Sequence, residues 1–246
     1  MAKHKIVSQA EWLIARKAHL VKEKAFTRAR DELSRGRREL PWTPVEKEYR
    51  FDGLEGEKTL ADLFDRRSQL LVYHFMFGAD WEQGCKSCSF LADSYNGAVT
   101  HLAHRDVTMV TASIAPLGKL EAFKQRMGWD FKWVSSAPSN FNRDFHVSFT
   151  EQERRDSTGT DNYRDSSFPV EEGPGISAFV IDSGQMYHTY SSYGRGLDML
   201  ITAYNLLDLM PKGRDELDLD WGMQWLRHHD RYDDPNADDP IHESKI

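Results

Sequence analysis

QLLVYHFMFGADWEQGCKSC, residues 69–88, is the stretch that decides the fold. Its first part, residues 69–77, is almost entirely apolar, which predicts a strand buried on both faces of a sheet that helices cover. A polar, glycine-containing turn then leads to Cys85 and Cys88, and an apolar helical pattern follows to about His104. The stretch therefore predicts a strand, a turn and two cysteines at the start of a helix.

Cys85 and Cys88 are the only cysteines among the 246 residues. At a helix start, unpaired backbone N–H groups and the helix dipole favour a thiolate, so we expect Cys85 to be the more exposed, attacking thiol. Lys86 is expected to help Cys85 ionise. Cys88, one turn deeper, would be the shielded thiol that resolves a mixed disulfide. The alternative interpretation is a buried structural pair.

Composition and charge restrict the class of protein. The chain carries a formal net charge of -7 and has a pI near 5.8, which argues against a nucleic-acid surface. Its densest basic cluster, residues 35–38, is short and typical of a solvated helix end. Because the sequence has no apolar run of membrane-spanning length and no signal-peptide pattern at its start, we expect a cytoplasmic protein without membrane partners. In a reducing cytosol, a Cys-x-x-Cys pair is typically catalytic or metal-binding.

Three parts are expected along the chain. Residues 1–44 would form one amphipathic helix, which starts at a capping box at Ser8 and stops near Gly36, and a proline-containing linker. The helix could dock on the following domain or on a second subunit, and the sequence does not choose between them. Residues 45–211 would form the α/β domain. Residues 212–246 are a polar C-terminal extension, in which Trp221 and Trp225 suggest an anchoring helix before an acidic tail.

The other predicted elements follow from short periodic segments and turn residues. They are an edge strand at 46–51, a capped helix at 59–64, a strand at 107–113, a helix at 116–127, an aromatic-rich segment at 129–134, a short helix at 141–149, a long loop or lid at 151–175, a hairpin at 176–191 and an apolar helix at 197–210. The lid could also be a disordered insertion.

The order strand, Cys-x-x-Cys helix, strand, helix, hairpin and last helix is that of the thioredoxin fold. With the motifs at 77–90, 127–129 and 190–198, the chain resembles a group of bacterial thioredoxin-like proteins catalogued as a domain of unknown function and predicted to be dithiol-disulfide oxidoreductases. The resemblance runs over nearly the whole chain. It implies an α/β thioredoxin-like fold, with a central mixed β-sheet flanked by helices, and a disulfide-exchange reaction that uses no cofactor.

The chain departs from thioredoxins around the cysteines. Thioredoxins carry tryptophan directly before the first cysteine, whereas here Trp81 stands four residues before Cys85, so substrate recognition must differ. Thioredoxins also place a cis-proline opposite the motif. Ile176 falls at that position and Pro174 lies two residues earlier, which leaves open whether the Gly173–Pro174 bond is cis. Asp80 is the candidate for the acid that accepts the proton of the resolving cysteine.

Peroxiredoxins are the second group of relatives to consider. In them a Thr-x-x-Cys motif occupies this turn, so Cys88 would be the peroxide-attacking residue. Against this reading, Cys85 replaces the threonine, no proline precedes the motif, and Ile176 stands where the supporting arginine is expected. A peroxidase that uses Cys88 remains the alternative to a disulfide oxidoreductase. Its partners would be peroxides, whereas the oxidoreductase would need a disulfide-containing protein or a small thiol substrate, with an external thiol reductant.

Two further readings involve no redox chemistry. Cys85, Cys88, His101 and His104 nearly match a zinc-finger spacing. If residues 88–104 form one helix, however, Cys88 and His101 lie about 20 Å apart, which no single zinc ion spans. We therefore expect no metal site. A non-catalytic binding protein on a thioredoxin fold is the other alternative, because a fold does not determine a function.

Overall fold

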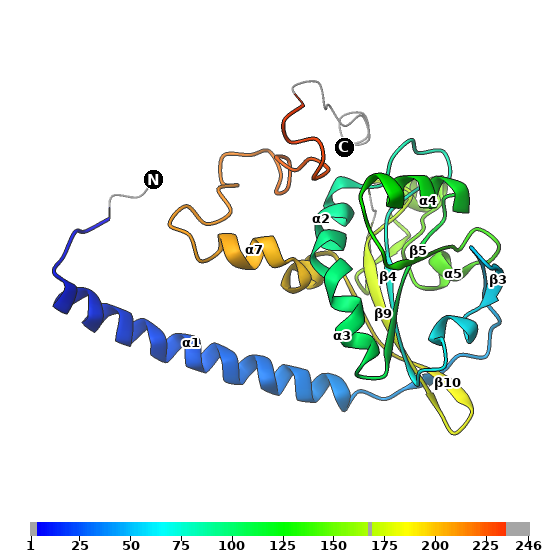
Figure 1. Cartoon of the computed structure of the whole chain (residues 1–246), viewed down its shortest axis with the longest axis horizontal. Helices are drawn as coiled ribbons and strands as arrows, with labels where there is room; N and C mark the ends of the chain where they lie inside the picture. The colour runs from blue at the N-terminus through cyan, green and yellow to red at the C-terminus, as the bar shows by residue number, and fades with distance from the viewer. Residues whose placement is uncertain (1–3, 167–168, 235–246) are drawn as a thin grey trace. The chain divides into compact units, whose positions relative to one another are not determined.

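The computed structural model describes residues 4–166 and 169–234, and the chain divides into two compact units, Met1–Trp42 and Thr43–Ile246. The first unit consists of one helix, α1 (Gln9–Arg38), which is coloured blue in Figure 1. The predicted capping box is present: the Ser8 side chain accepts from the N–H of Glu11, whose carboxylate accepts from the N–H of Ser8. The helix continues two residues past Gly36, where three arginines in its last turn complement the helix dipole.

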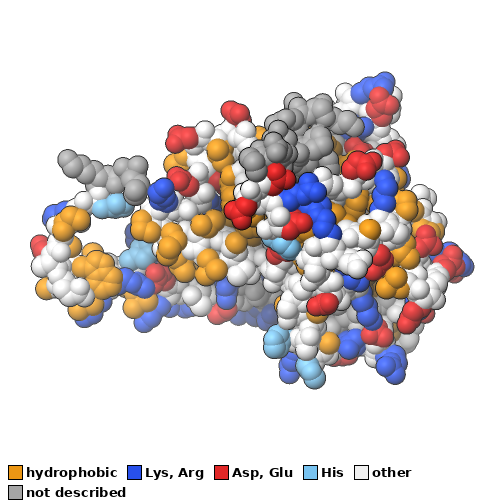
Figure 2. Space-filling model, turned by 45° about the horizontal axis from the view of Figure 1, so that its top comes forward, with side chains coloured by type: hydrophobic (Ala, Val, Ile, Leu, Met, Phe, Trp, Pro, Cys, Tyr) orange, Lys and Arg blue, Asp and Glu red, His pale blue; other side chains and the backbone are white. Residues whose placement is uncertain are grey.

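Helix α1 contains no buried residue. Its large apolar side chains, among them Trp12, Ile14, Phe26 and Leu33, are exposed. Figure 2 shows hydrophobic and basic side chains next to one another on this N-terminal part, at the left of the view. The predicted helix therefore forms, with its apolar side chains exposed.

The second unit is built on a mixed sheet with the strand order β1-β10-β9-β4-β5-β6-β2-β3. Strands β4, β5 and β6 are parallel, whereas β9 pairs antiparallel with β4 and β10 pairs antiparallel with β9. The strands are β1 (Thr43–Pro44), β2 (Arg50–Gly53), β3 (Gly56–Thr59), β4 (Gln69–His74), β5 (Val107–Ser113), β6 (Lys132–Ser135), β9 (Gly175–Asp182) and β10 (Gln185–Tyr193). The predicted central strand is thus β4, flanked on both sides by partners.

Alternate residues of β4 enter two different cores, as the pleat of a strand requires. Leu70 and Val72 join a cluster on one face of the sheet, whereas Tyr73 joins the cluster on the other face, which also contains both cysteines. The cysteine-side face is covered by α2 (Lys86–Tyr95), α4 (Leu117–Arg126) and α7 (Thr202–Leu207), and the opposite face by the 3-10 turn η1 (Asp62–Phe64) and α5 (Phe141–Asp144). This is the predicted thioredoxin-like α/β fold, and the prediction is confirmed (Figure 1).

Several predicted elements differ in detail. The helix expected to reach His104 stops at Tyr95, and a 3-10 turn, η2 (Asn96–Ala98), precedes α3 (Val99–Ala103). Gly97 lies in that turn, consistent with the weak helix preference of glycine. The expected edge strand at 46–51 lies instead at 50–53 and is not an edge, since β2 pairs with both β3 and β6.

The C-terminal helices were also predicted wrongly. The expected helix at 197–210 is a 3-10 segment, η3 (Gly194–Leu200), followed by α7, because Ile201 adopts extended backbone between them. This break allows Leu197, Ile201 and Tyr204 all to be buried in the core. Trp221 and Trp225 lie in turns rather than in a helix. The end of the predicted acidic tail lies outside the described residues.

The predicted lid contains structure. It comprises α6 (Glu151–Asp156), the two short strands β7 (Thr160–Asp161) and β8 (Arg164–Asp165), and a packed final part. In that part Glu172 is buried, accepts from the amide of Asn142 at 2.9 Å, and accepts a further hydrogen bond from Ser148. Burial raises the pKa of Glu172 to about 8. The end of this segment is therefore packed into the protein, which contradicts the alternative of a disordered insertion there. The Gly173–Pro174 bond is trans.

Candidate active site around Cys85 and Cys88

The turn before α2 is fixed by backbone contacts with the end of the central strand. Cys85 is the N-cap residue of α2, and its N–H donates to the carbonyl of Met76 at 3.0 Å. Its own carbonyl accepts from the N–H and the hydroxyl of Ser89, each at 2.9 Å. Position 84 requires glycine because the backbone there lies against the ring of Phe75, and a Cβ atom would come within 2.6 Å of that ring. The two cysteines therefore sit where the sequence predicts, at the start of a helix.

Both cysteines are equally buried, each with 2% of its surface exposed. The expectation that Cys85 would be the more exposed of the two is therefore wrong. The turn folds back against the aromatic side of the sheet, where Phe75 and Phe123 crowd Gly84. Residues from the C-terminal extension contact the neighbours of Cys85, since His228 reaches Gly84 and Trp221 reaches Lys86. The cysteines therefore form a buried pair, and Cys85 is not an exposed thiol at a helix tip.

Cys88 lies in a pocket of hydroxyl and thiol groups. It is hydrogen-bonded to Cys85 and to the hydroxyl of Tyr73, and it accepts from the N–H of Met76. Burial raises the pKa of the Cys88 thiol well above its usual range, and the contacts with Tyr73 and Met76 oppose this rise. Burial also raises the pKa values of Tyr73 and Tyr95 well above 10.0, so both phenols carry their protons at neutral pH.

The other residues predicted for the site lie in different surroundings. Asp80 is exposed, and the group that contacts Cys88 is a phenol rather than a carboxylate. Trp81 is half-buried: its indole packs on Gly78 and donates to Glu171. Lys86 is buried, with its Nζ 5.4 Å from the ring centroid of Trp221. The proposed roles of Asp80, Trp81 and Lys86 in the reaction stay predictions.

A family model covers almost the entire sequence. It describes a bacterial protein of unknown function (DUF899) and matches residues 1–232. The chain belongs to this DUF899 family. The resemblance read from the motifs is thereby confirmed, and the family's description names no substrate. No curated protein gives a significant sequence match.

Solved structures similar to this DUF899 protein have low sequence identity. Peroxidoxin BcpB from Mycobacterium tuberculosis is 14% identical, with a TM-score of 0.45 over 66% of this chain and 94% of that one. A PrxQ mutant from Xylella fastidiosa is 10% identical, with a TM-score of 0.43 over 67% and 94% of the two chains. A putative thiol:disulfide interchange protein DsbE from Chlorobium tepidum is 14% identical, with a TM-score of 0.41 over 67% and 97%.

Two contacts of the DUF899 site escaped prediction. Tyr73 has the apolar surroundings of any core aromatic, so nothing local indicates its bond to Cys88. His228 is buried and its Nε2 lies 2.8 Å from the carbonyl oxygen of Gly84, although 144 residues separate them. The N–H at Nε2 donates to Gly84, and the other ring nitrogen then accepts from Arg126 at 3.1 Å. No periodicity or spacing signals a contact of such long range.

The described residues contain no group of three or more His, Cys, Asp or Glu side chains placed to hold a metal ion. His101 is exposed on α3, which is a separate helix from the one that carries the cysteines. Nor is any helix within 4–166 and 169–234 long and apolar enough to cross a membrane.

Proposed function

We propose that this DUF899 protein is a dithiol–disulfide oxidoreductase of the cytoplasm. The observation that carries the proposal is the pair of cysteines, hydrogen-bonded to each other, at the N-terminus of a helix whose N–H groups favour a thiolate. Cys85 is assigned the attack because it is the N-cap residue. Cys88 is assigned the resolving step because burial raises the pKa of its thiol and so disfavours a first attack by Cys88.

The reaction transfers two electrons in two exchanges. The Cys85 thiolate attacks one sulfur of the substrate disulfide, forms a mixed disulfide and releases the other sulfur as a thiolate. Cys88 then attacks Sγ of Cys85, which forms the Cys85–Cys88 disulfide and releases the second substrate thiolate. The proton lost by Cys88 passes to that leaving thiolate. An external thiol reductant restores the dithiol, and the substrate is a disulfide-containing protein or a small disulfide.

A peroxidase that uses Cys88 is the second candidate, and one observation argues against it. A peroxide-attacking cysteine must be a thiolate before its substrate arrives, whereas burial raises the pKa of Cys88. A non-catalytic binding role would make no chemical use of the two neighbouring cysteines. The oxidoreductase, the peroxidase and the binding role each predict a different result in a turnover assay.

The purified, reduced protein is expected to reduce insulin or glutathione disulfide with a thiol reductant supplying electrons, and to turn over hydrogen peroxide no faster than the reductant alone. Consumption of the reductant measures both rates. Mass spectrometry of the product should show the loss of two hydrogens, localised to the peptide that carries both cysteines. Turnover with peroxide but not with disulfides would favour the peroxidase, and no turnover with either would favour a binding role.

Tyr73→Phe is expected to slow the resolving step by about tenfold, because a hydrogen bond to a charged group contributes about 1.5 kcal/mol or more. The Tyr73 hydroxyl stabilises the Cys88 thiolate, so its loss should shift the pH profile of the second exchange to higher pH. Tyr95→Phe is the matched control, since the Tyr95 hydroxyl bonds Thr111 at 2.6 Å instead. Equal pH profiles for the two variants would contradict the role given to Tyr73.

A further inference from the structure

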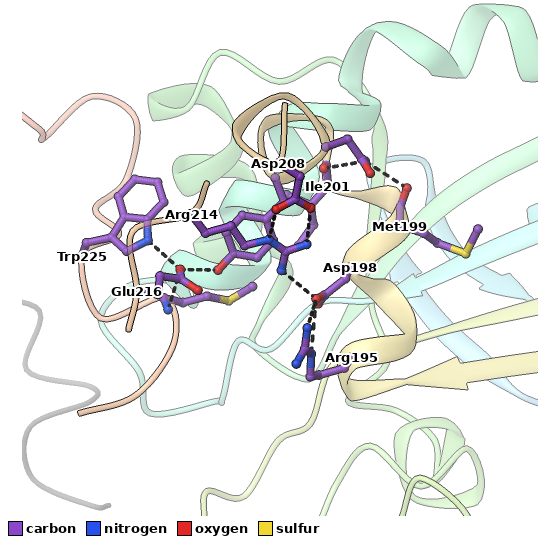
Figure 3. Close-up of polar contacts among 11 residues, drawn as sticks. Arg195, Asp198, Met199, Ile201, Asp208, Arg214, Glu216 and Trp225 are labelled. Carbon is purple, nitrogen blue, oxygen red and sulfur yellow. Dashed lines mark hydrogen bonds and ion pairs between the residues drawn. The ribbon is translucent and has the colours of Figure 1, made fainter. Parts of the chain in front are cut away.

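Residues 216–230, here called the C-terminal strap, begin at a cluster of polar side chains next to α7. The carboxylate oxygen Oε1 of Glu216 accepts from the hydroxyl of Tyr204 at 2.7 Å, the indole N–H of Trp225 at 2.7 Å and the N–H of Met223 at 3.1 Å. Just before the strap, Arg214 donates to Asp198 and Asp208, each at 2.9 Å (Figure 3). The start of the strap is therefore firmly attached.

The strap then runs along α2, the helix that carries Cys88 and begins at Cys85. Trp221 covers the ammonium group of Lys86, and the ring of Trp225 lies 5.7 Å from that of Phe90. Further on, Nδ1 of His229 lies 2.8 Å from the carboxylate of Asp93. Lys86, Phe90 and Asp93 recur at the spacing of one helix face. The strap thus lies along one side of α2 from its first residue to its third turn.

The strap also reaches the turn beside the attacking thiol. His228 donates to the carbonyl of Gly84, the residue before Cys85, at 2.8 Å. The ring of His228 packs edge-on against that of Phe123, with 5.2 Å between the ring centroids. Two residues further on, the carboxylate of Asp230 pairs with the guanidinium of Arg126 at 2.9 Å. Each of these contacts is made by a side chain. Together these contacts hold the end of the strap beside the residue that precedes Cys85.

Within the strap, the backbone hydrogen bonds close only local turns. The N–H groups of Leu219, Gln224 and Leu226 each donate to the residue three positions earlier, at 3.3, 3.4 and 3.1 Å. The strap residues belong to no strand of the sheet. A segment held by side chains and local turns opens at lower cost than the hydrogen-bonded strands beneath it. Opening the strap therefore need not disturb β4.

We propose that the C-terminal strap is a displaceable cover that controls access to Cys85. This inference rests on the proposed function, since a disulfide must approach Sγ of Cys85 and that thiol is only 2% exposed. In the closed state the strap shields both thiols from disulfides and oxidants. Release of the His228 and Trp221 contacts uncovers the Gly84–Cys85 turn, and an incoming disulfide substrate occupies the space that the strap leaves.

Alkylation of the reduced, full-length protein by iodoacetamide tests the cover without any redox partner. The double variant His228→Ala/Trp221→Ala should label Cys85 about tenfold faster than the wild type, the factor that corresponds to about 1.4 kcal/mol in the opening equilibrium. Leu217→Ala is the control, because Leu217 is a fully exposed strap residue. Peptide mass spectrometry gives the rate at each cysteine, and near-ultraviolet circular dichroism checks the fold. Equal labelling rates in a folded double variant would overturn the proposal.

Hydrogen–deuterium exchange of the unaltered protein gives a second test that no folding defect can obscure. The strap amides should exchange faster than those of β4 and β5, because the strap opens locally. Exchange of the strap only together with the central strands would overturn the proposal. Faster alkylation in a protein that reduces no disulfide would support the cover and contradict only the proposed reaction.

Discussion

Replacement of Cys85 with serine is expected to abolish attack on disulfides, lowering the rate of reduction by at least about a thousandfold. A serine hydroxyl does not ionise near neutral pH, and Cys88 is buried with a raised pKa, so it cannot take over the first step. The measurement is the initial rate of reduction of glutathione disulfide by the purified variant. Retention of a tenth or more of the wild-type rate would show that Cys85 is not the attacking thiol.

The partner variant, Cys88→Ser, should react once and then stop. Cys85 still attacks, but no resolving thiol follows, so a mixed disulfide on Cys85 accumulates and mass spectrometry detects it. The peroxidase mechanism predicts the reverse pattern. In that case Cys85→Ser would form sulfenic acid at Cys88 with peroxide, whereas Cys88→Ser would not react. A trapped adduct on Cys88 in Cys85→Ser would overturn the assignment of the two roles.

The second large effect concerns stability rather than reaction. Glu172 has a pKa of about 8 in the folded protein, raised by burial from 4.5. Between these values the folded state keeps the proton and the unfolded state has lost it, so this group stabilises the fold fully below pH 4.5. This stabilisation falls by about 1.4 kcal/mol per pH unit as the pH rises above 4.5, and it is lost once the pH has passed through 8. Over the whole window the loss amounts to a few kcal/mol.

Glu172→Gln should remove this pH dependence. Glutamine has nearly the same shape, keeps an oxygen that accepts from Asn142 and places an uncharged amide group beside the Ser148 hydroxyl. At pH 8 the variant should therefore be more stable than the wild type by about 2–4 kcal/mol, with little difference near pH 5. Urea unfolding at both pH values measures this. Glu55→Gln, at an exposed position, is the control. A difference independent of pH would show that Glu172 is ionised in the fold.

The central part of the fold follows from local sequence patterns. The apolar run of residues 69–77 and the tight turn between the two halves of the 176–191 hairpin predict β4, β9 and β10, and the capping box at Ser8 predicts the start of α1. These signals are strong because burial and hydrogen bonding act within a few residues. The position of both cysteines at a helix start was equally readable.

The surroundings of the cysteines depend on contacts that the local sequence does not encode. The sequence identifies Cys85 as a helix-start thiol, but it does not reveal that His228 contacts the preceding residue, Gly84. Glu172 stands in a polar segment typical of an exposed loop, yet Asn142 and Ser148 draw it into the interior. Tyr73 looks like any core aromatic. In each case a tertiary partner overrides the local pattern, and one sequence alone does not reveal that partner.

The edge of the sheet at β1 and β10 is poorly suited to pairing with a strand of another chain. Strand β10 is nine residues long, but its outer neighbour β1 consists only of Thr43 and Pro44. A long, flat edge would invite another chain to add a strand and begin an aggregate. Pro44 has no N–H to offer such a chain, and the irregular register between His188 and Tyr190 distorts the remaining edge. Both features disfavour the addition of a strand from another chain at this edge of the sheet.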